Sequence, residues 1–438
     1  MRFRSILAGF LLVLPYAVSA QATQKYFGYF YNDVSAATVN NQDSPQTALS
    51  ENYGHITLNH IDDWGGATDA TGLSESNRKL FKGLAEAKSL GVKAMITAAP
   101  FVFLYTGDLQ HTGVWVNDPN AAKKWSALVD QLVSNGYLVP GNPPLSTVAA
   151  IYVVDEPSGS GLADQNNQPN PALANAISAI RGDVRTTSIP LASIMADTAR
   201  QSFNDIQAGI KLFDWVGFDN YSLSQSAWDG TYNNLRSKLS VNQRTILVPL
   251  ADSCDGSSPQ DPDLFFTKSQ SSEVALLMPF HWWSRTGCFG VRDIPSIRSK
   301  YEEIGLAFKE STNPVIGAID KPRGALITGW ACNSGISTSI SVDLYVGGLA
   351  GGGGVAVGRY PANLASDPSV STSCQVGSSA FNFKIVVPAN IRHQYRGQPF
   401  YVYGISGFGG DNPTLTNAGM YNIQNPNSGP VVTELFDD

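Results

Sequence analysis

Eight short apolar runs recur between residues 25 and 283, each separated from the next by a longer and more polar stretch. Their composition suits strands that are buried on both faces. Such strands form parallel sheets, because a parallel neighbour can be reached only through a crossover connection, usually a helix. The runs cover residues 25–32, 54–61, 92–99, 149–156, 189–197, 214–221, 245–252 and 274–283.

The stretches between these runs carry apolar residues at helical spacing. In residues 74–91, Leu80 and Leu84 fall on one face, and Gly91 is suited to end the helix. The same spacing predicts further helices in residues 118–136, 170–182, 233–239 and 294–308.

Eight such units in roughly 290 residues match the usual size of a (β/α)8 barrel. We therefore predict an α/β fold, a TIM barrel, over residues 21–312. An open doubly wound sheet is the alternative, but no glycine-rich phosphate loop follows the first run.

Beyond the barrel the helical periodicity stops. Residues 309–324 read as a linker, and five short β-rich runs follow, separated by Gly, Pro, Ser and Asn. This pattern predicts a small antiparallel β-sandwich over residues 313–438. The segment 347–354, "GGLAGGGG", is most simply a flexible hairpin loop.

Residues 1–20 have the basic start, the apolar middle and the small final residues of a signal peptide. We therefore expect a secreted or periplasmic protein without stable membrane insertion, in a compartment where disulfides persist. Four cysteines allow three pairings, and the position of the linker favours Cys254 with Cys288 and Cys332 with Cys374.

Several function classes lack the residues that they need. The net charge is -7 and the basic residues are scattered, which argues against nucleic acid. There is no GxSxG elbow and no closely spaced histidine pair for a metal: His55 and His60 lie five residues apart on an expected strand. We predict no metal and no nicotinamide, flavin or nucleotide cofactor, and the sequence makes no prediction about oligomeric state.

Acidic and aromatic residues gather where the expected strands end. In a (β/α)8 barrel these ends form one rim, and that rim carries the active site. Some of these acids suit helix caps, Asp197 among them, but Glu is a poor cap and is costly to bury unpaired, so Glu156 is the strongest candidate. The set is Asp62, Asp63, Trp64, Asp155, Glu156, Asp197, Asp219, Tyr221, Asp252, His281, Trp282 and Trp283.

Two carboxyl groups in a cleft are the machinery of glycoside hydrolysis. One of them protonates the leaving oxygen, and the other attacks the sugar or activates water. Aromatic residues make up 10% of the chain, which is compatible with a substrate whose C–H faces stack on rings. The expected partner is thus a polysaccharide or an oligosaccharide.

The motifs "YVVDEP" at the fourth strand, "DWVGFDNYS" at the sixth and "MPFHWW" at the eighth resemble secreted (β/α)8-barrel glycoside hydrolases over residues 25–310. In the retaining clan of these enzymes the fourth strand usually ends in Asn-Glu-Pro, and its Glu is the acid/base. The resemblance implies this role for Glu156. The chain departs from the clan in having Asp155 in place of the Asn, and Asp252 where the seventh strand should end in a Glu.

We therefore predict an exported glycoside hydrolase that acts within a polysaccharide, with Glu156 as general acid/base. Asp252 or Asp219 is its expected partner, and Asp155 tunes the site. Residues expected to bind sugar are Trp64, Tyr221, Trp282, Trp283, His281 and Asp63. The bridge between Cys254 and Cys288 would steady the cleft wall beside Asp252.

Three alternatives remain open on the sequence. The adjacent Asp155 and Glu156 also resemble the pair of barrel enzymes that cleave N-acetylhexosamine linkages, in which the substrate acetamido group attacks; Tyr221 would then polarise that group. The second alternative is a non-catalytic glycan-binding protein on a degenerate barrel. The third is a lyase or an esterase that acts on the same glycans. The C-terminal module resembles small β-sandwich modules of exported bacterial enzymes, and either binds glycan or stabilises the barrel.

Overall fold

The structure is a computed structural model of the 438-residue chain. It describes residues 24–30, 32, 48–61, 70–106, 114–163, 168–196, 207–221, 224–254, 257–284, 287–377, 380–407 and 412–424, with the side chains of 70–78 excepted. The predicted signal peptide and the predicted site residues Asp62, Asp63, Trp64 and Asp197 lie outside the described residues.

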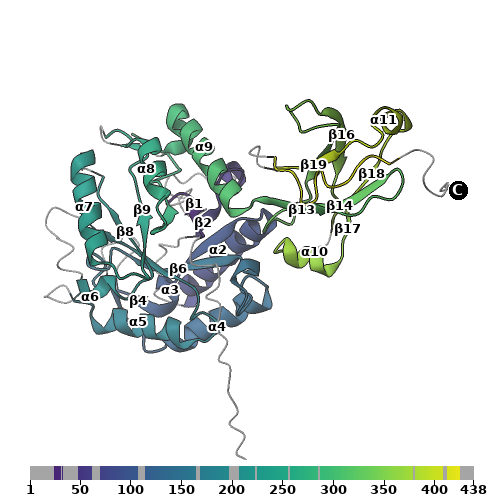
Figure 1. The fold of residues 1–438 in the computed structure, drawn as a ribbon. Coiled ribbons are helices and arrows are strands. Elements are labelled where there is room, and N and C mark those ends of the chain that lie inside the picture. Colours follow the sequence, from purple (N-terminus) through teal and green to yellow (C-terminus); the bar gives the residue numbers. More distant parts are fainter. Residues whose placement is uncertain are drawn as a thin grey trace, which may run out of the picture.

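Eight parallel strands form a nearly closed barrel (Figure 1). Their order around the sheet is β1-β11-β9-β8-β7-β6-β3-β2, so each strand lies beside its neighbour in the chain. β1 and β2 approach each other at the seam, where the Thr57 amide donates to the Phe27 carbonyl over 2.8 Å. The strands are β1 (Tyr26–Phe27), β2 (Leu58–Ile61), β3 (Lys93–Thr97), β6 (Val148–Asp155), β7 (Leu191–Ala196), β8 (Trp215–Asp219), β9 (Arg244–Leu247) and β11 (Val274–Leu277).

Helices follow the strands and cover the outside of the barrel (Figure 1). Local sequence explains several of their ends: Asn170 caps α5 by accepting hydrogen bonds from the amides of Ala172 and Leu173, and Gly91 ends the α2 region with φ of 68°. The helices are α1 (Ala48–Asn52), α2 (Ala70–Ser89), α3 (Ala99–Val102), α4 (Ala121–Ser134), α5 (Pro171–Gly182), α6 (Gln207–Ile210), α7 (Gln225–Lys238), α8 (Pro262–Ser269) and α9 (Pro295–Thr312).

The strands separate two apolar cores. Inward side chains such as Met95, Tyr152 and Trp215 fill the barrel, whereas outward side chains such as Ile151 and Leu247 pack against the helices. Both faces of the parallel sheet are therefore buried, as the apolar runs predicted. The barrel is a packed interior, and its strand ends are the places where polar groups gather.

The barrel also contains short elements that we did not predict. β4 (Phe103–Tyr105) and β5 (Trp115–Asn117) form a hairpin after α3, and β10 (Ser253–Cys254) pairs with β12 (Cys288–Phe289). Helices α1, α3, α6 and α8 were also not predicted, because helices of four to eight residues are too short to show a periodicity. A 3-10 turn, η5 (Val291–Asp293), precedes α9.

The C-terminal module consists of two antiparallel sheets around a separate core that contains Ile327, Val342, Leu344, Phe383 and Val402. One sheet has the order β13-β14-β18-β17 and the other β16-β15-β19. The strands are β13 (Val315–Ile319), β14 (Leu326–Asn333), β15 (Ser341–Val346), β16 (Val355–Pro361), β17 (Leu364–Ala365), β18 (Ala380–Val386) and β19 (Phe400–Ile405). A (β/α)8 barrel with an all-β module was predicted, and this fold class is confirmed.

Two details of the module differ from the sequence prediction. Part of the predicted linker is a strand, because Val315–Ile319 pairs with β14 along its whole length. Two short helices, α10 (Pro368–Ser373) and α11 (Ala389–Gln394), interrupt a region where we expected none. The glycine-rich segment 347–354 connects β15 to β16, as predicted for a hairpin loop, and Cys332 is bonded to Cys374.

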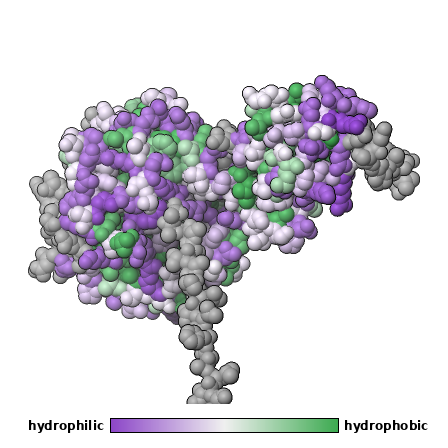
Figure 2. Space-filling model, viewed as in Figure 1, coloured by the Kyte–Doolittle hydropathy of each residue, from purple (hydrophilic) through white to green (hydrophobic). Residues whose placement is uncertain are grey.

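On the face seen in Figure 2, apolar residues form small areas among hydrophilic ones, over both the barrel and the module. None of the helices in the described part of the chain is both long and apolar enough to cross a bilayer.

Candidate active site

The described candidate residues come from four of the eight strands of the barrel. Asp155 and Glu156 stand at the end of β6, Asp219 ends β8, Asp252 follows β9 and His281 follows β11. Since all these strands run parallel, their carboxyl ends meet at one rim. The rim carries two groups of side chains, an acidic cluster and an Asp–His pair.

Glu156 has an unusual backbone conformation. Its φ is 40°, in the left-handed region that Glu rarely adopts, and Pro157 follows it. Two hydrogen bonds hold this turn: the Glu156 amide donates to the Ile194 carbonyl over 2.9 Å, and the Ser160 amide donates to the Glu156 carbonyl over 2.9 Å. A backbone of this kind costs about 1–3 kcal/mol and is concentrated at functional sites.

Two hydrogen bonds fix the position of Asp155, one to its side chain and one to its backbone carbonyl. The Tyr152 hydroxyl, which comes from the barrel interior, donates to Asp155 Oδ1. The Ser160 hydroxyl donates to the Asp155 carbonyl over 2.7 Å. The turn after β6 therefore holds two adjacent carboxyl groups in defined positions.

Asp219 completes the acidic cluster. Burial, the negative charges of Glu156 and Asp155, and a side-chain hydrogen bond with Glu156 raise the pKa of Asp219 to about 8. A hydrogen bond between two carboxyl groups requires a proton on one of them, because ionised carboxylates only accept. Asp219 therefore keeps its proton at neutral pH and can donate it in a hydrogen bond to Glu156.

The close contact of Glu156 and Asp219 limits what the two can do together. The carboxyl groups that flank a scissile glycosidic bond stand about 5–5.5 Å apart in retaining enzymes and about 6.5–9.5 Å apart in inverting ones. Two carboxyl groups that interact directly, as Glu156 and Asp219 do, are not placed on either side of a sugar. Asp219 is therefore suited to supply or hold the proton of Glu156.

The second group is Asp252 with His281. Asp252 Oδ2 lies 2.9 Å from His281 Nδ1, and the carboxyl side chain is 3% exposed. Its other oxygen, Oδ1, is buried and has no hydrogen-bond partner among the described residues. The backbone holds the pair in register, because the Ala251 amide donates to the Phe280 carbonyl over 2.7 Å.

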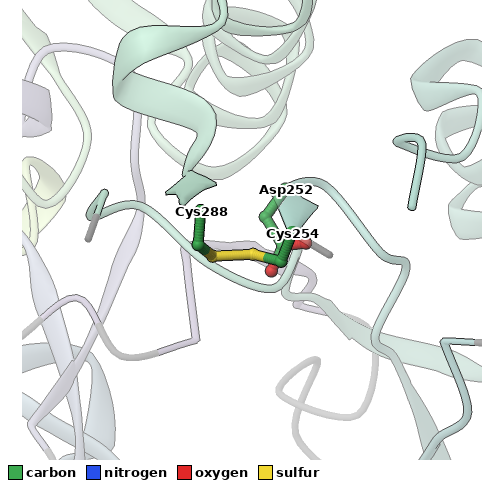
Figure 3. A group of neighbouring side chains, drawn as sticks. All are labelled: Asp252, Cys254 and Cys288. Carbon is green, nitrogen blue, oxygen red and sulfur yellow. A yellow bond between two sulfur atoms is a disulfide. The ribbon is translucent and has the colours of Figure 1, made fainter. Parts of the chain in front are cut away.

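The disulfide between Cys254 and Cys288 lies beside Asp252 (Figure 3), as predicted. The two sulfur atoms and a carboxylate oxygen of Asp252 lie within 4.8 Å of one another. Because the sulfurs are bonded to each other, they are not thiolates, and this group is not a thiolate metal site. The disulfide instead joins the loops that follow β9 and β11.

Aromatic contacts connect the two groups. Tyr221, two residues past Asp219, stacks on Phe280 with ring centroids 4.6 Å apart, and the Phe280 ring is 4.8 Å from that of His281. Tyr221 was predicted to bind sugar, and it lies on the rim between the acidic cluster and the Asp–His pair. Phe280 was not identified from the sequence, although it is the inward residue just before His281.

Trp282 and Trp283 occupy the hydrophobic core. Trp282 is fully buried, packs on Tyr29 at 4.9 Å between centroids, and donates from Nε1 to Glu51 over 3.1 Å. Trp283 is also buried, with the Arg292 guanidinium 4.8 Å from its ring. Neither ring has an exposed face on which a sugar could stack, so we leave both out of the proposed binding surface.

The two histidines near β2 belong to the interior. His55 Nε2 lies 3.0 Å from the Tyr29 hydroxyl. His60 is fully buried against Tyr152, with 4.7 Å between ring centroids, and burial lowers its pKa to about 3. His60 is therefore a neutral ring inside the barrel, and neither of its nitrogens has a hydrogen-bond partner among the described residues.

A cavity of about 740 Å³ opens at the opposite end of the barrel. Residues at the amino ends of the strands line it, among them Tyr26, Asp214, Arg244 and Glu273. None of the described candidate residues lines this cavity, and active sites of the fold lie at the carboxyl ends of the strands. We therefore place the candidate site at the acidic rim.

No protein-family model matches the chain. No curated protein matches it either. Among solved structures, it is similar to an engineered protein, with a TM-score of 0.39 and 11% identity over 90% of this chain and 94% of that one. It is also similar to a GH18 chitinase from Pseudoalteromonas aurantia, with a TM-score of 0.32 and 10% identity over 59% of this chain and 94% of that one. A third similar structure is a xylanase-A-amylase inhibitor protein, with a TM-score of 0.32 and 12% identity over 65% and 96%. Similarities this distant carry no argument about activity, which rests on the rim residues.

Proposed function

We propose that this protein is an exported glycoside hydrolase that cleaves within a polysaccharide, with Glu156 as its general acid. The observation that carries the proposal is the cluster of Asp155, Glu156 and Asp219 at the carboxyl end of the barrel, where burial and then the charge of Glu156 raise the pKa of Asp219 to about 8. Cleavage of a glycosidic bond needs a carboxyl group that still holds a proton at neutral pH. Asp219, beside Glu156 in this cluster, meets the requirement.

The roles follow from the positions of the groups. Glu156, on its strained turn, donates the proton to the departing sugar oxygen. Asp219 stores that proton between turnovers, and the Asp155 charge favours its retention. Asp252, on the same rim and outside the acidic cluster, is the second carboxylate of the reaction. Tyr221 forms part of the sugar-binding surface.

The test is the release of new reducing ends by the purified protein on a panel of polysaccharides that includes N-acetylated ones. We expect the wild type to cleave at least one of them, and Glu156→Gln to lower kcat about 10²–10⁴-fold, the usual contribution of a general acid. The matched control is Glu303→Gln, because Glu303 is 78% exposed on α9 and distant in sequence from the rim.

Each outcome has a defined meaning. Equal activity of the wild type and Glu156→Gln would move the chemistry to other residues. An inactive wild type that still binds glycans would favour a binding protein, and release of unsaturated sugars would favour a lyase. Cleavage confined to N-acetylated substrates would indicate attack by the substrate acetamido group.

A further inference from the structure

The Asp252–His281 pair has the arrangement of a general base with its positioning residue. Asp252 Oδ2 lies 2.9 Å from His281 Nδ1. A carboxylate only accepts hydrogen bonds, so Nδ1 carries the hydrogen, and a ring that acts as a base has its lone pair on Nε2. Nε2 has no hydrogen-bond partner among the described residues, and the His281 side chain keeps 12% exposure.

Asp252 itself is badly placed to attack a sugar. Its side chain is 3% exposed, Oδ2 is bound to His281, and Oδ1 is buried. A nucleophilic carboxylate must touch the anomeric carbon, and a buried one bound to a histidine does not reach it. A negative charge in this position instead orients the imidazole and stabilises its protonated form.

Two structural features fix the pair in place. The bonded backbones of Ala251 and Phe280 set His281 opposite Asp252, and the Cys254–Cys288 disulfide joins the two loops next to the carboxylate (Figure 3). Other titratable or charged groups around His281 are Tyr221, which stacks on Phe280, and Arg292, which lies over Trp283. None of these is bonded to the His281 ring among the described residues.

We propose that His281 is the general base of the hydrolysis, that Asp252 is its positioning residue, and that the reaction inverts the configuration of the anomeric carbon. This inference rests on the proposed glycoside hydrolase function and refines the role given there to Asp252. It also separates the chain from the retaining clan that its fourth-strand motif resembles.

The reaction is a single displacement. The bond between the anomeric carbon and the leaving oxygen breaks, and that oxygen takes the proton from Glu156. A water oxygen bonds to the opposite face of the same carbon, and its proton passes to His281 Nε2. Solvent then returns a proton from His281 to the Glu156–Asp219 pair, so that no group is oxidised or reduced.

The first experiment is proton NMR of the sugar anomer that the wild type releases first from a substrate identified in the panel. We expect the anomer opposite to that of the cleaved bond. Release of the same anomer would overturn the inference, because a single displacement cannot retain configuration. This measurement needs no variant and therefore does not depend on how a substitution affects folding.

The second experiment uses His281→Gly. We expect kcat to fall about 10²–10⁴-fold with little change in KM. Free imidazole should raise the kcat of this variant at least about tenfold. Imidazole should not restore Glu156→Gln, and His393→Gly, at an exposed histidine of the C-terminal module, should leave kcat unchanged. Asp252→Asn should also lower kcat, and Asp252→Glu, which keeps the carboxylate, should lower kcat less.

The two proposals fail in different ways. An inactive wild type refutes the glycoside hydrolase itself. An active wild type that loses activity in Glu156→Gln, but retains configuration or tolerates His281→Gly within about threefold, refutes only the role of His281.

Discussion

Replacing Asp219 by Asn tests whether this carboxyl group keeps its proton in the folded protein. Its pKa is raised to about 8, from an ordinary value near 3.8, chiefly by burial and then by the charge of Glu156. Asn has nearly the shape of the protonated acid, and its amide can donate to Glu156 as the carboxyl group does. The substitution therefore removes the titration and keeps the contact.

The sign of the effect follows from proton binding. Between about pH 4 and pH 8 the folded protein holds one more proton at Asp219 than the unfolded chain does. The stability that this group contributes is fully present below about pH 4 and is lost as the pH rises through 8. As the pH rises, the free energy of unfolding of the wild type should decrease more than that of Asp219→Asn. The difference should be about 1.4 kcal/mol per pH unit, or about 3 kcal/mol between pH 5 and pH 7.

The assay is urea unfolding at several pH values, followed by circular dichroism. Asp263→Asn is the control, because Asp263 is 61% exposed on α8, and its curve should run parallel to that of the wild type. Parallel curves for wild type and Asp219→Asn would refute the reasoning. In activity, kcat/KM of the wild type should decline above about pH 8, where Asp219 loses its proton, and in Asp219→Asn the decline should begin at a lower pH, because no neighbouring carboxyl group supplies Glu156 with a proton.

Three further predictions concern the surroundings of the site. Replacing both Cys254 and Cys288 by Ser should lower the free energy of unfolding by about 2–4 kcal/mol and also lower kcat, because the loop beside the Asp–His pair loosens; thermal unfolding and steady-state kinetics measure both. Trp282→Ala should cost about 3–5 kcal/mol of stability in urea unfolding and leave the KM of the remaining folded enzyme unchanged, since this ring is core. Tyr152→Phe removes the hydrogen bond to Asp155 and should lower kcat more than it lowers stability; a larger effect on stability would contradict a role in the site.

The barrel could be predicted because its signals are repeated. Runs such as 149–156 and 245–252 are long and apolar enough to be strands in any context, and both contribute strands, β6 (Val148–Asp155) and β9 (Arg244–Leu247). The secondary-structure prediction was wrong where a segment has few residues that indicate its conformation. Val315–Ile319 follows Pro314 and contains Gly317, which makes it look like a linker, but its backbone forms a sheet with β14.

The site could be predicted only as a set of residues. The parallel topology places every strand end on one rim, so Glu156, Asp219 and Asp252 were found from their positions in the chain. Their contacts were not, because Glu156 and Asp219 come from β6 and β8 with β7 between them, and only side-chain direction brings them together. The direction of Trp282, toward α1 and away from the rim, was equally invisible in the sequence.

The Asp252–His281 contact is the exception that the sequence could have indicated. Both residues follow the ends of adjacent strands, β9 and β11, by a similar number of positions, and residues at matching heights on neighbouring strands face each other. The prediction instead treated Asp252 as a partner carboxylate of Glu156 and His281 as a sugar contact. The similar positions of Asp252 and His281 after neighbouring strands are the signal that indicates their contact.

Three features of the rim reduce the stability of the fold, which is itself an argument for function. Glu156 has a left-handed backbone, Asp219 is a carboxyl group buried next to like charges, and Asp252 buries an oxygen without a partner among the described residues. Each costs free energy that an apolar or a glycine residue would avoid. Most of the described barrel interior consists of apolar side chains such as Met95 and Trp215, although His60 is also buried there without a hydrogen-bond partner among the described residues. These groups occur together at the end of the barrel where this fold performs catalysis, and the proposed reaction needs both a retained proton and an oriented histidine at that place.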